Sequence, residues 1–514
     1  MRHFCSFVLA LSLGLLQAGD AACQVPVDSG LSASRTSEGG TGTHIARIEN
    51  GLLPSVVIEG QPPATMKLTD RMQYYHVPGV SIAFFDHGQI VWARGYGQAD
   101  VRTGKQVTPE TLFQAGSISK PIAAMGALKL VERGKLRLDG NVNEALRSWK
   151  LPENEFTQDQ KVTLRRILSH SAGLTVHGFP GYASGEPVPS VVQILDGEKP
   201  ANSEAVRVDT VPGTTLRYSG GGLVMMQLMM TDVTGESFPQ LMRDLVLGPA
   251  GMSHSTYEEP LPHRQWPDAA VPYDENGRPI QGGFHTYPEM AAAGLWTTAS
   301  DLARAAIEVQ REYAGTSHKI LSQSMAREML THQKETWGLG FELEQTGHTP
   351  RFGHFGVNDG FVATLQAYRD MAQGIVIMTN GRQGEKLITE ILRAVALEYG
   401  WNDFHPFERT LVGIDPTTLP SFTGKYSLPN PDGDDQLTVT ARNNRLYLTG
   451  SYSVGSTYHF EIYEPAELLP EAPQQFFTLS TGLTTFRFDK NDKGTVENCV
   501  VIAGGSQRQA KKIP

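Results

Sequence analysis

The chain has 514 residues, of which 40% are hydrophobic and 19% are charged, and its formal net charge is −10. This is the composition of an ordinary globular protein, and the length is sufficient for two or three globular units. The acidic balance and the lack of any Lys/Arg-rich run argue against nucleic acid as a partner, because neutralising phosphates requires an excess of basic residues.

Residues 1–23 have the three-part layout of a secretory signal peptide. Arg2 precedes an apolar run from Phe4 to Leu16, and small residues such as Gly19 and Ala22 follow it. The apolar run is too short to span a bilayer as a mature helix. We therefore expect a periplasmic or secreted protein.

The three cysteines indicate neither a disulfide framework nor a zinc site. Cys5 lies in the predicted signal peptide, and Cys23 and Cys499 lie far apart in the sequence. Cys23 is a candidate for N-terminal lipidation, although Asp20 occupies the position where a lipoprotein signal carries an apolar residue. Such a lipid is the only membrane attachment that the sequence suggests.

The N-terminal part of the mature chain, residues 24–65, is predicted to be flexible. Residues 28–43 are rich in Ser, Gly and Thr, which is typical of a tether. The fold is expected to begin between His44 and Leu68. Shortly afterwards, the β-rich runs 80–86 and 89–97 flank His87-Gly88, which predicts a hairpin.

Residues 66–400 are predicted to form an α+β domain, an antiparallel sheet flanked by helices with an inserted helical subdomain. A helix is expected over 119–133, with Pro121 in its tolerant first turn and Gly134 at its end. Strands are expected over 361–368 and 374–379. Further helices are expected over 163–169, 223–234, 238–245, 300–313 and 385–399.

The pattern changes after Trp401. Pro406, Pro416 and Pro420 indicate a linker over residues 401–420. Beyond it, short alternating runs such as 436–440 and 484–488 predict a small all-β barrel over residues 421–514.

The segment Ser117-Ile118-Ser119-Lys120 carries the candidate chemistry. On a helix, positions i and i+3 share one face, so the Lys120 amine can reach the Ser117 hydroxyl, which is otherwise a weak nucleophile. A helix N-terminus and partial burial both disfavour an ammonium ion and lower a lysine pKa. A Ser-x-x-Lys pattern, which defines only two of four residues, also occurs by chance. Here, however, a predicted strand, a turn at Gly116 and a predicted helix surround the pair.

From Met66 to Gly381 the sequence resembles the class C β-lactamase and serine DD-peptidase superfamily, which includes D-aminopeptidases and esterases. The resemblance lies in four segments in the expected order. They are Phe113-Gln114-Ala115-Gly116-Ser117-Ile118-Ser119-Lys120, Leu168-Ser169-His170-Ser171-Ala172-Gly173-Leu174, Pro212-Gly213-Thr214 with Tyr218-Ser219-Gly220, and Gly353-His354-Phe355-Gly356.

The resemblance implies a role for each matching residue. Ser117 is the nucleophile, and Lys120 and Tyr218 relay protons. His354 polarises the substrate or supports the hydroxyl network, and Gly356 lets the substrate approach the strand. The backbone N–H groups of Ser117 and Val357 would form the oxyanion hole.

Gly220 departs from the family pattern. The superfamily usually carries Asn there, whose amide helps to bind acyl-amide groups, so we do not expect efficient β-lactamase action. Gly220 is expected either to leave a gap for a bulkier acyl group or to be compensated by another polar residue. His170 and Asp301 are expected to be structural, as a buried turn residue and as a helix-start residue.

The resemblance favours an exported serine hydrolase that forms an acyl-enzyme on Ser117, with no metal or organic cofactor. The C-terminal unit, opening with Phe422-Thr423-Gly424-Lys425-Tyr426, resembles lipocalin-like barrels appended to D-aminopeptidases and peptide-cyclising thioesterases. A peptidase for small or unusual peptides, D-residue or linearised cyclic ones, is the first expectation. A carboxylesterase, a DD-peptidase or weak β-lactamase, and a non-catalytic cell-wall-binding protein are the alternatives, and an oligomer is compatible with all of them.

Overall fold

The computed structural model describes residues 40–346, 349–428, 435–454, 458–479, 482–503 and 506–514. The chain divides into two compact units. One comprises residues 67–389, and the other combines the residues up to 66 with residues 390–514. The predicted signal peptide and Cys23 lie outside the described residues. No helix among the described residues is long and apolar enough to cross a membrane.

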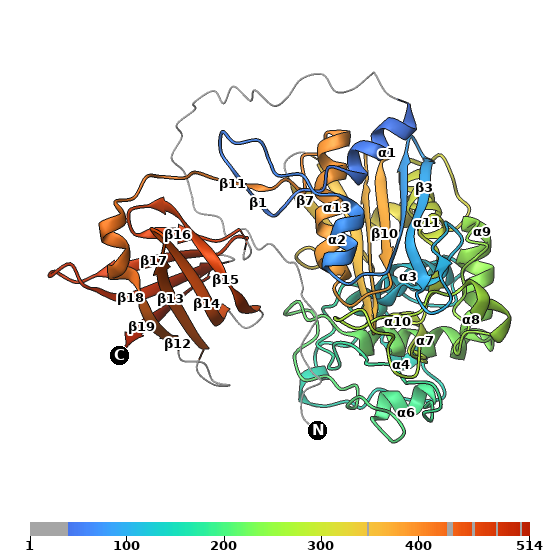
Figure 1. Cartoon of the computed structure of the whole chain (residues 1–514). Helices are drawn as coiled ribbons and strands as arrows, with labels where there is room; N and C mark the ends of the chain where they lie inside the picture. The colour runs from blue at the N-terminus through green and yellow to red at the C-terminus, as the bar shows by residue number, and fades with distance from the viewer. Residues whose placement is uncertain (1–39, 347–348, 429–434, 455–457, 480–481, 504–505) are drawn as a thin grey trace. The chain divides into compact units, whose positions relative to one another are not determined.

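The larger unit is built around a seven-stranded antiparallel sheet (Figure 1). The predicted hairpin is confirmed: Asp86 pairs with Gln89, and His87 and Gly88 both have positive φ values of 49° and 70°. Two positive φ angles are what a two-residue hairpin turn of type I′ requires. In spatial order the strands are β4 (Lys105–Gln106), β3 (Gln89–Asp100), β2 (Gly79–Asp86), β10 (Gly374–Thr379), β9 (Phe361–Tyr368), β8 (Thr349–Asn358) and β7 (Glu342–Thr346).

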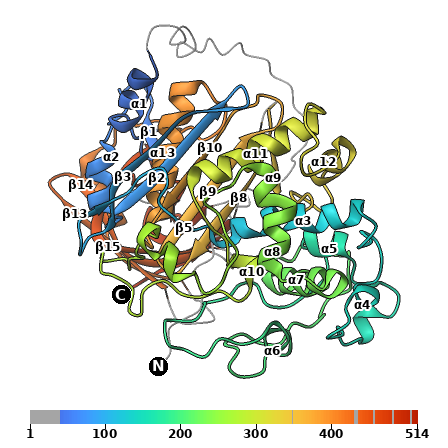
Figure 2. The same cartoon turned by 90° about the vertical axis from the view of Figure 1, so that its right-hand side faces the viewer.

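The middle strands of this sheet are buried on both faces. Every residue of β10 is buried, as are all residues of β2 except its last. The amphipathic helix α11 (Ala299–Ala314) covers one face and packs on β2, β3 and β10 (Figure 2). A strand that is covered on both faces reads as a continuous apolar run, which is why β2 and β10 were predictable.

The remaining helices of this unit include the predicted helical subdomain, whose centre is α3 (Ser119–Glu132). Nearly every residue of α3 from Ser119 to Leu130 is buried, as expected for a helix that is apolar on all sides. The others are α2 (Leu68–Tyr74), α4 (Val142–Ala145), α5 (Leu164–Leu168), α6 (Val191–Asp196), α7 (Gly220–Thr234), α8 (Phe238–Met242), α9 (Gly248–Ala250), α10 (Met290–Ala293), α12 (Gln323–Met329) and α13 (Gly384–Tyr399), the last of which crosses the boundary between the units.

The expectation of flexibility for residues 24–65 is wrong from residue 41 onward. Helix α1 (Thr41–Glu49) buries Ile45 and Ile48, and its Arg47 guanidinium donates to Glu398. Strand β1 (Val56–Ile58) pairs in parallel with β11 (Phe407–Arg409), so the predicted linker 401–420 also contains a strand. A Ser/Gly/Thr-rich composition does not reveal partners that lie more than 300 residues further along the chain.

The C-terminal strands close into an eight-stranded barrel, which confirms the predicted all-β fold. Its interior is a packed core that contains the aromatic side chains of Phe422, Tyr426, Phe476 and Phe488. The strands are β12 (Gly424–Leu428), β13 (Asp435–Arg442), β14 (Arg445–Val454), β15 (Tyr458–Ala472), β16 (Gln475–Phe477), β17 (Thr485–Lys490), β18 (Val496–Ala503) and β19 (Ser506–Ile513).

Candidate active site

Ser117 lies in a 3-10 turn, Gly116–Ile118, between strand β5 (Phe113–Gln114) and helix α3. Gly116 has φ +52°, a left-handed conformation that glycine adopts without strain. The buried hydroxyl of Ser119 donates to the Gly116 carbonyl oxygen at 2.6 Å and closes the turn. Ser119, the first residue of α3, therefore stabilises the turn. Ser117 within the turn remains partly exposed.

The amine of Lys120 points at the serine. Its Nζ donates to Ser117 Oγ at 2.8 Å and to the carbonyl oxygen of Ala292 at 2.8 Å. Lys120 is only 2% exposed, and burial lowers its pKa to about 7. Since an ordinary lysine has a pKa of 10.5, a large fraction of this amine is neutral at neutral pH and able to accept a proton.

Tyr218 faces this pair with a protonated phenol. Burial raises its pKa well above the usual value, and a hydrogen bond with the side chain of Ser117 opposes that shift only in part. The Nζ of Lys120 lies 5.1 Å from the centre of the Tyr218 ring. The hydroxyl is thus a proton donor over the whole working range of pH.

His354 lies on β8, is 5% exposed and is neutral. Its Nδ1 is 2.5 Å from the carbonyl oxygen of Phe355, which can only accept, so we assign the proton to Nδ1. Burial and then the nearby Lys120 lower its pKa to about 3. Its Nε2 is buried without a hydrogen-bond partner among the described residues, so a lone pair is available there.

Strand β8 approaches the nucleophile turn so closely that only glycine fits at the contact. A Cβ on Gly356 would lie 2.0 Å from the carbonyl oxygen of Ala115, and one on Gly116 would lie 2.5 Å from the backbone nitrogen of Val357. The Val357 N–H is therefore beside the turn that carries Ser117. This is the juxtaposition that an oxyanion hole made from these two N–H groups requires.

Gly220 does not leave an open space. It is buried at the start of α7, and a Cβ there would lie 3.0 Å from both the carbonyl oxygen of His177 and Cε2 of Phe179. The expectation of a gap for a bulkier acyl group is therefore wrong. A loop from elsewhere in the chain occupies that place.

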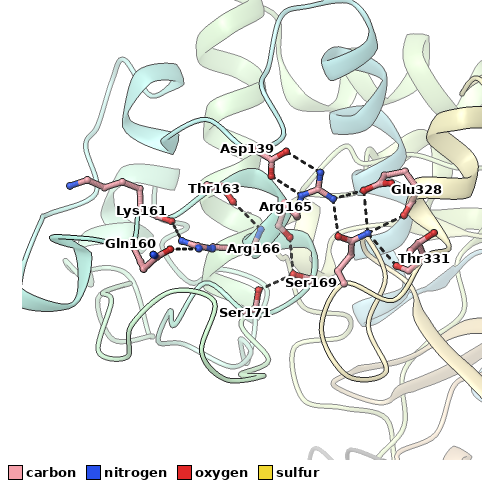
Figure 3. Close-up of polar contacts among 11 residues, drawn as sticks. Asp139, Gln160, Lys161, Thr163, Arg165, Arg166, Ser169, Ser171, Glu328 and Thr331 are labelled. Atoms are coloured by element: carbon pink, nitrogen blue, oxygen red, sulfur yellow. Dashed lines mark hydrogen bonds and ion pairs between the residues drawn. The ribbon is translucent and has the colours of Figure 1, made fainter.

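Ser169 and Ser171, on either side of His170, are held by polar contacts that start from α5 (Figure 3). Arg165 of this helix forms ion pairs with Asp139, at 2.6 Å, and with Glu328. Ser169 Oγ donates to the Arg165 carbonyl at 2.8 Å and lies 2.9 Å from Ser171 Oγ. These contacts flank His170, whose ring centre lies 4.2 Å from that of Tyr218.

His170 and Asp301 have the structural surroundings that were predicted. His170 is 2% exposed, has φ +51° and accepts a hydrogen bond at Nδ1 from the Ser219 N–H. Asp301 is buried near the start of α11, where it accepts from the His254 N–H and from Arg304.

Two residues of the site were missed by the sequence analysis. Trp337 packs its ring 5.6 Å from Tyr218 and 5.4 Å from His354, and His177 packs 4.7 Å from Tyr218. Neither residue belongs to a recognisable segment, and only the fold brings them to Tyr218. Together with His170 they surround Tyr218 with aromatic rings.

A partly exposed serine that is hydrogen-bonded to a buried lysine of lowered pKa and faced by a protonated tyrosine can carry out acyl transfer. The chain is a serine hydrolase. A family model described as Beta-lactamase matches residues 66–399. The chain therefore belongs to the Beta-lactamase family.

Known proteins similar to this chain include penicillin-binding proteins and an esterase. The chain is 26% identical to penicillin-binding protein 4 of Amycolatopsis lactamdurans, over 62% of this chain and 85% of that protein. It is 27% identical to esterase EstB of Burkholderia gladioli, over 50% of this chain and 72% of that protein. The octameric penicillin-binding protein homologue from Pyrococcus abyssi shares the fold, with a TM-score of 0.57 at 22% identity over 86% of this chain and 98% of that one.

Proposed function

We propose that this protein is an exported peptidase that cleaves amide bonds in small or unusual peptides, including D-residue and linearised cyclic peptides, through an acyl-enzyme on Ser117. The observation that carries the proposal is the protonated Tyr218 hydroxyl beside Ser117 and Lys120. An amine leaves a tetrahedral intermediate only after its nitrogen is protonated, whereas an activated ester needs no such donor. The Tyr218 phenol holds its proton at working pH, so that proton is present when the amine departs and can be replaced from Lys120.

The reaction runs in two halves. Lys120 takes the proton of Ser117 Oγ as that oxygen attacks the carbonyl carbon, and the N–H groups of Ser117 and Val357 stabilise the oxyanion. The Tyr218 hydroxyl gives its proton to the departing amine and is reprotonated from Lys120. Water then attacks the acyl carbon and loses a proton to the same pair, which passes a proton to Ser117 Oγ as the carbon–Oγ bond breaks and the carboxylic acid leaves. His354, neutral and with its Nε2 lone pair available, accepts a hydrogen bond from the substrate or from a hydroxyl of the site.

A carboxylesterase is the second candidate. The same nucleophile and oxyanion hole hydrolyse esters, and the similarity to an esterase of Burkholderia gladioli favours this alternative. The appended barrel, which resembles those of D-aminopeptidases, favours the peptidase.

A DD-peptidase or β-lactamase fits less well. Its substrates carry a free carboxylate near the scissile bond, which calls for a cation beside the nucleophile. Arg217, next to Tyr218, pairs with Asp209, and Arg351, two residues before Gly353, pairs with Glu344. His354 is neutral at working pH because its pKa is about 3.

Labelling separates an enzyme from a non-catalytic cell-wall-binding protein. We expect a fluorophosphonate to add to Ser117 of the folded protein, located by peptide mass spectrometry, and to leave Ser117→Ala unlabelled. A folded protein that takes up no label would overturn the proposal. Values of kcat/KM on L- and D-amino-acid amides, linear peptides, p-nitrophenyl esters and nitrocefin then rank the candidates, and ester turnover without amide cleavage would favour the esterase.

Export and assembly are part of the proposal. The signal-peptide pattern of residues 1–23 supports a periplasmic or secreted enzyme, with Cys23 as the candidate lipid anchor. Cell fractionation and the mass of the mature N-terminus test both points. The fold shared with an octameric homologue supports self-assembly, which light scattering measures.

A further inference from the structure

The loop Thr175–Phe179, here called the 175–179 loop, lies on the N-terminal end of α7 in an unfavourable backbone conformation. Val176 has φ +63°, which is sterically costly for a residue branched at Cβ. Such a residue persists in the left-handed region only where its surroundings impose it, and strained residues of this kind gather at functional sites.

The first N–H groups of α7 impose this conformation. Gly220 N–H donates to the His177 carbonyl and Gly221 N–H to the Val176 carbonyl, both at 3.0 Å. Ser219 Oγ donates to the Thr175 carbonyl at 2.7 Å and accepts from the Gly222 N–H at 3.1 Å. The loop thus supplies partners that the first turn of a helix otherwise lacks.

The glycines at the start of α7 make room for the loop. A Cβ on Gly220 would meet His177 O and Phe179, and one on Gly221 would lie 3.0 Å from Thr175 O and 2.7 Å from Val206. The glycine at position 220, where the family usually has Asn, and the strained 175–179 loop therefore depend on each other, because the loop occupies the space that a side chain at position 220 would need.

The arrangement holds His177 against Tyr218. Their ring centres lie 4.7 Å apart with an interplanar angle of 41°. His177 is an exposed residue, whereas the other two imidazoles near Tyr218, those of His170 and His354, are buried. Burial of part of the ring and the nearby Lys120 lower the pKa of His177, so the imidazole is neutral and can both donate and accept a hydrogen bond.

We propose that His177 binds the leaving-group side of the substrate, by a hydrogen bond from its ring to a neutral amide group one position beyond the scissile nitrogen. The inference rests on the proposed function. If Tyr218 protonates the departing amine, the leaving group lies at the Tyr218 hydroxyl, and His177 is an exposed polar residue that packs on the same tyrosine ring. The substrate class is then a peptide that continues past the cleaved bond, with its amide group there uncharged.

A matched pair of leaving groups tests this inference. Acetyl-phenylalanine, in L and D forms, is coupled either to glycinamide or to isobutylamine, which has a similar shape but no carboxamide. His177→Phe keeps an aromatic ring against Tyr218 and removes both ring nitrogens, and His177→Gln keeps a hydrogen-bonding group. His318→Ala, at an exposed histidine between α11 and α12, is the control.

We expect His177→Phe to lower kcat/KM for the glycinamide substrate at least tenfold, mainly through KM. We expect a change of less than twofold for the isobutylamide and for the rate of fluorophosphonate labelling, and partial retention of glycinamide cleavage in His177→Gln. Equal losses on both amides, slower labelling of Ser117, or no loss at all in a folded variant would each overturn the role of His177 alone. Wild-type protein that is labelled but cleaves neither amide would overturn the proposed peptidase function, and the role of His177 with it.

Discussion

The Nζ of Lys120 lies 2.8 Å from Oγ of Ser117 and an equal distance from the carbonyl oxygen of Ala292. Two acceptors thus face an amine that is 2% exposed, and neither is a carboxylate. The protonated amine gains no full negative charge as a partner, and burial dominates its pKa. The buried amine, with no carboxylate partner at these two contacts, therefore has a pKa low enough for Lys120 to act as a base.

Replacing the base should abolish activity and stabilise the fold. We expect Lys120→Met to lower kcat by about 10³-fold or more. The apolar side chain should also raise the free energy of unfolding at pH 6 by ~1–4 kcal/mol, because a buried ammonium is removed. Chemical denaturation measures the stability, and Lys129→Met on the same helix, where Lys129 pairs with Glu132 at 3.1 Å, is the control. A variant that is inactive and also less stable would contradict the second part.

The stability gain of Lys120→Met should depend on pH. The folded amine has a pKa of about 7 and the unfolded amine about 10.5, so the unfolded state binds more protons between these values. The free energy of unfolding of the wild type therefore rises with pH across this window. The difference between variant and wild type should be largest below pH 7 and shrink toward pH 10, and a difference that is constant with pH would refute the lowered pKa.

The rate of labelling of Ser117 should rise with pH as Lys120 loses its proton, with a midpoint near 7. Titration of His354 should not change the labelling rate above pH 5, since its pKa is about 3, and Tyr218 stays protonated in this range. Labelling with a fluorophosphonate, quenched at set times across pH 5–10, gives the rate of labelling as a function of pH. If His354→Gln shifted the midpoint while the protein remained folded, the histidine and not the lysine would be the base.

Removing the phenolic hydroxyl should affect amides more than esters. Tyr218→Phe keeps the ring between His170 and Lys120, at 4.2 and 5.1 Å, and removes the proton donor. We expect kcat on amides to fall by about 10²–10⁴-fold, with a smaller loss on p-nitrophenyl esters, whose leaving group needs no proton. Tyr182→Phe, which removes another buried hydroxyl, one that accepts from the Asn202 N–H, should leave both rates within about twofold.

Adding one methyl group should separate the strand from the turn. Gly356→Ala would place its Cβ 2.0 Å from the Ala115 carbonyl oxygen, so β8 must move away from Ser117. We expect kcat to fall by about 10²–10³-fold, the loss typical of one oxyanion donor. Gly413→Ala, which meets nothing within 4 Å, should be neutral. Circular dichroism and thermal melting verify that the variants compared are folded.

Local sequence patterns predicted the elements that satisfy local rules. The ranges of β9 and β10 were predicted to the residue, and α3 and α11 to within one, because apolar periodicity and caps act over a few positions. Helix α7 starts at Gly220, three residues before the prediction, since three glycines do not resemble a helix start. Its first turn forms because the 175–179 loop accepts its N–H groups, a contact that no local rule contains.

The residues of the site likewise differ in how far the sequence could predict them. Ser117 and Lys120 lie three residues apart, and one helical turn is enough to bring them together. Tyr218 and His354 were predictable only through the resemblance to a family. His177 and Trp337 could not be found by either route, because their rings reach Tyr218 through long-range packing.

The contact between Gly356 and Ala115 also makes the site a late product of folding. The nucleophile turn and the strand that supplies Val357 come from distant parts of the sequence, and they touch only after β8 has joined the sheet beside β9. Contacts of such long range form slowly, after local helices and hairpins. A chain that has folded only in part therefore carries Ser117 without its oxyanion partner, and is not yet a hydrolase.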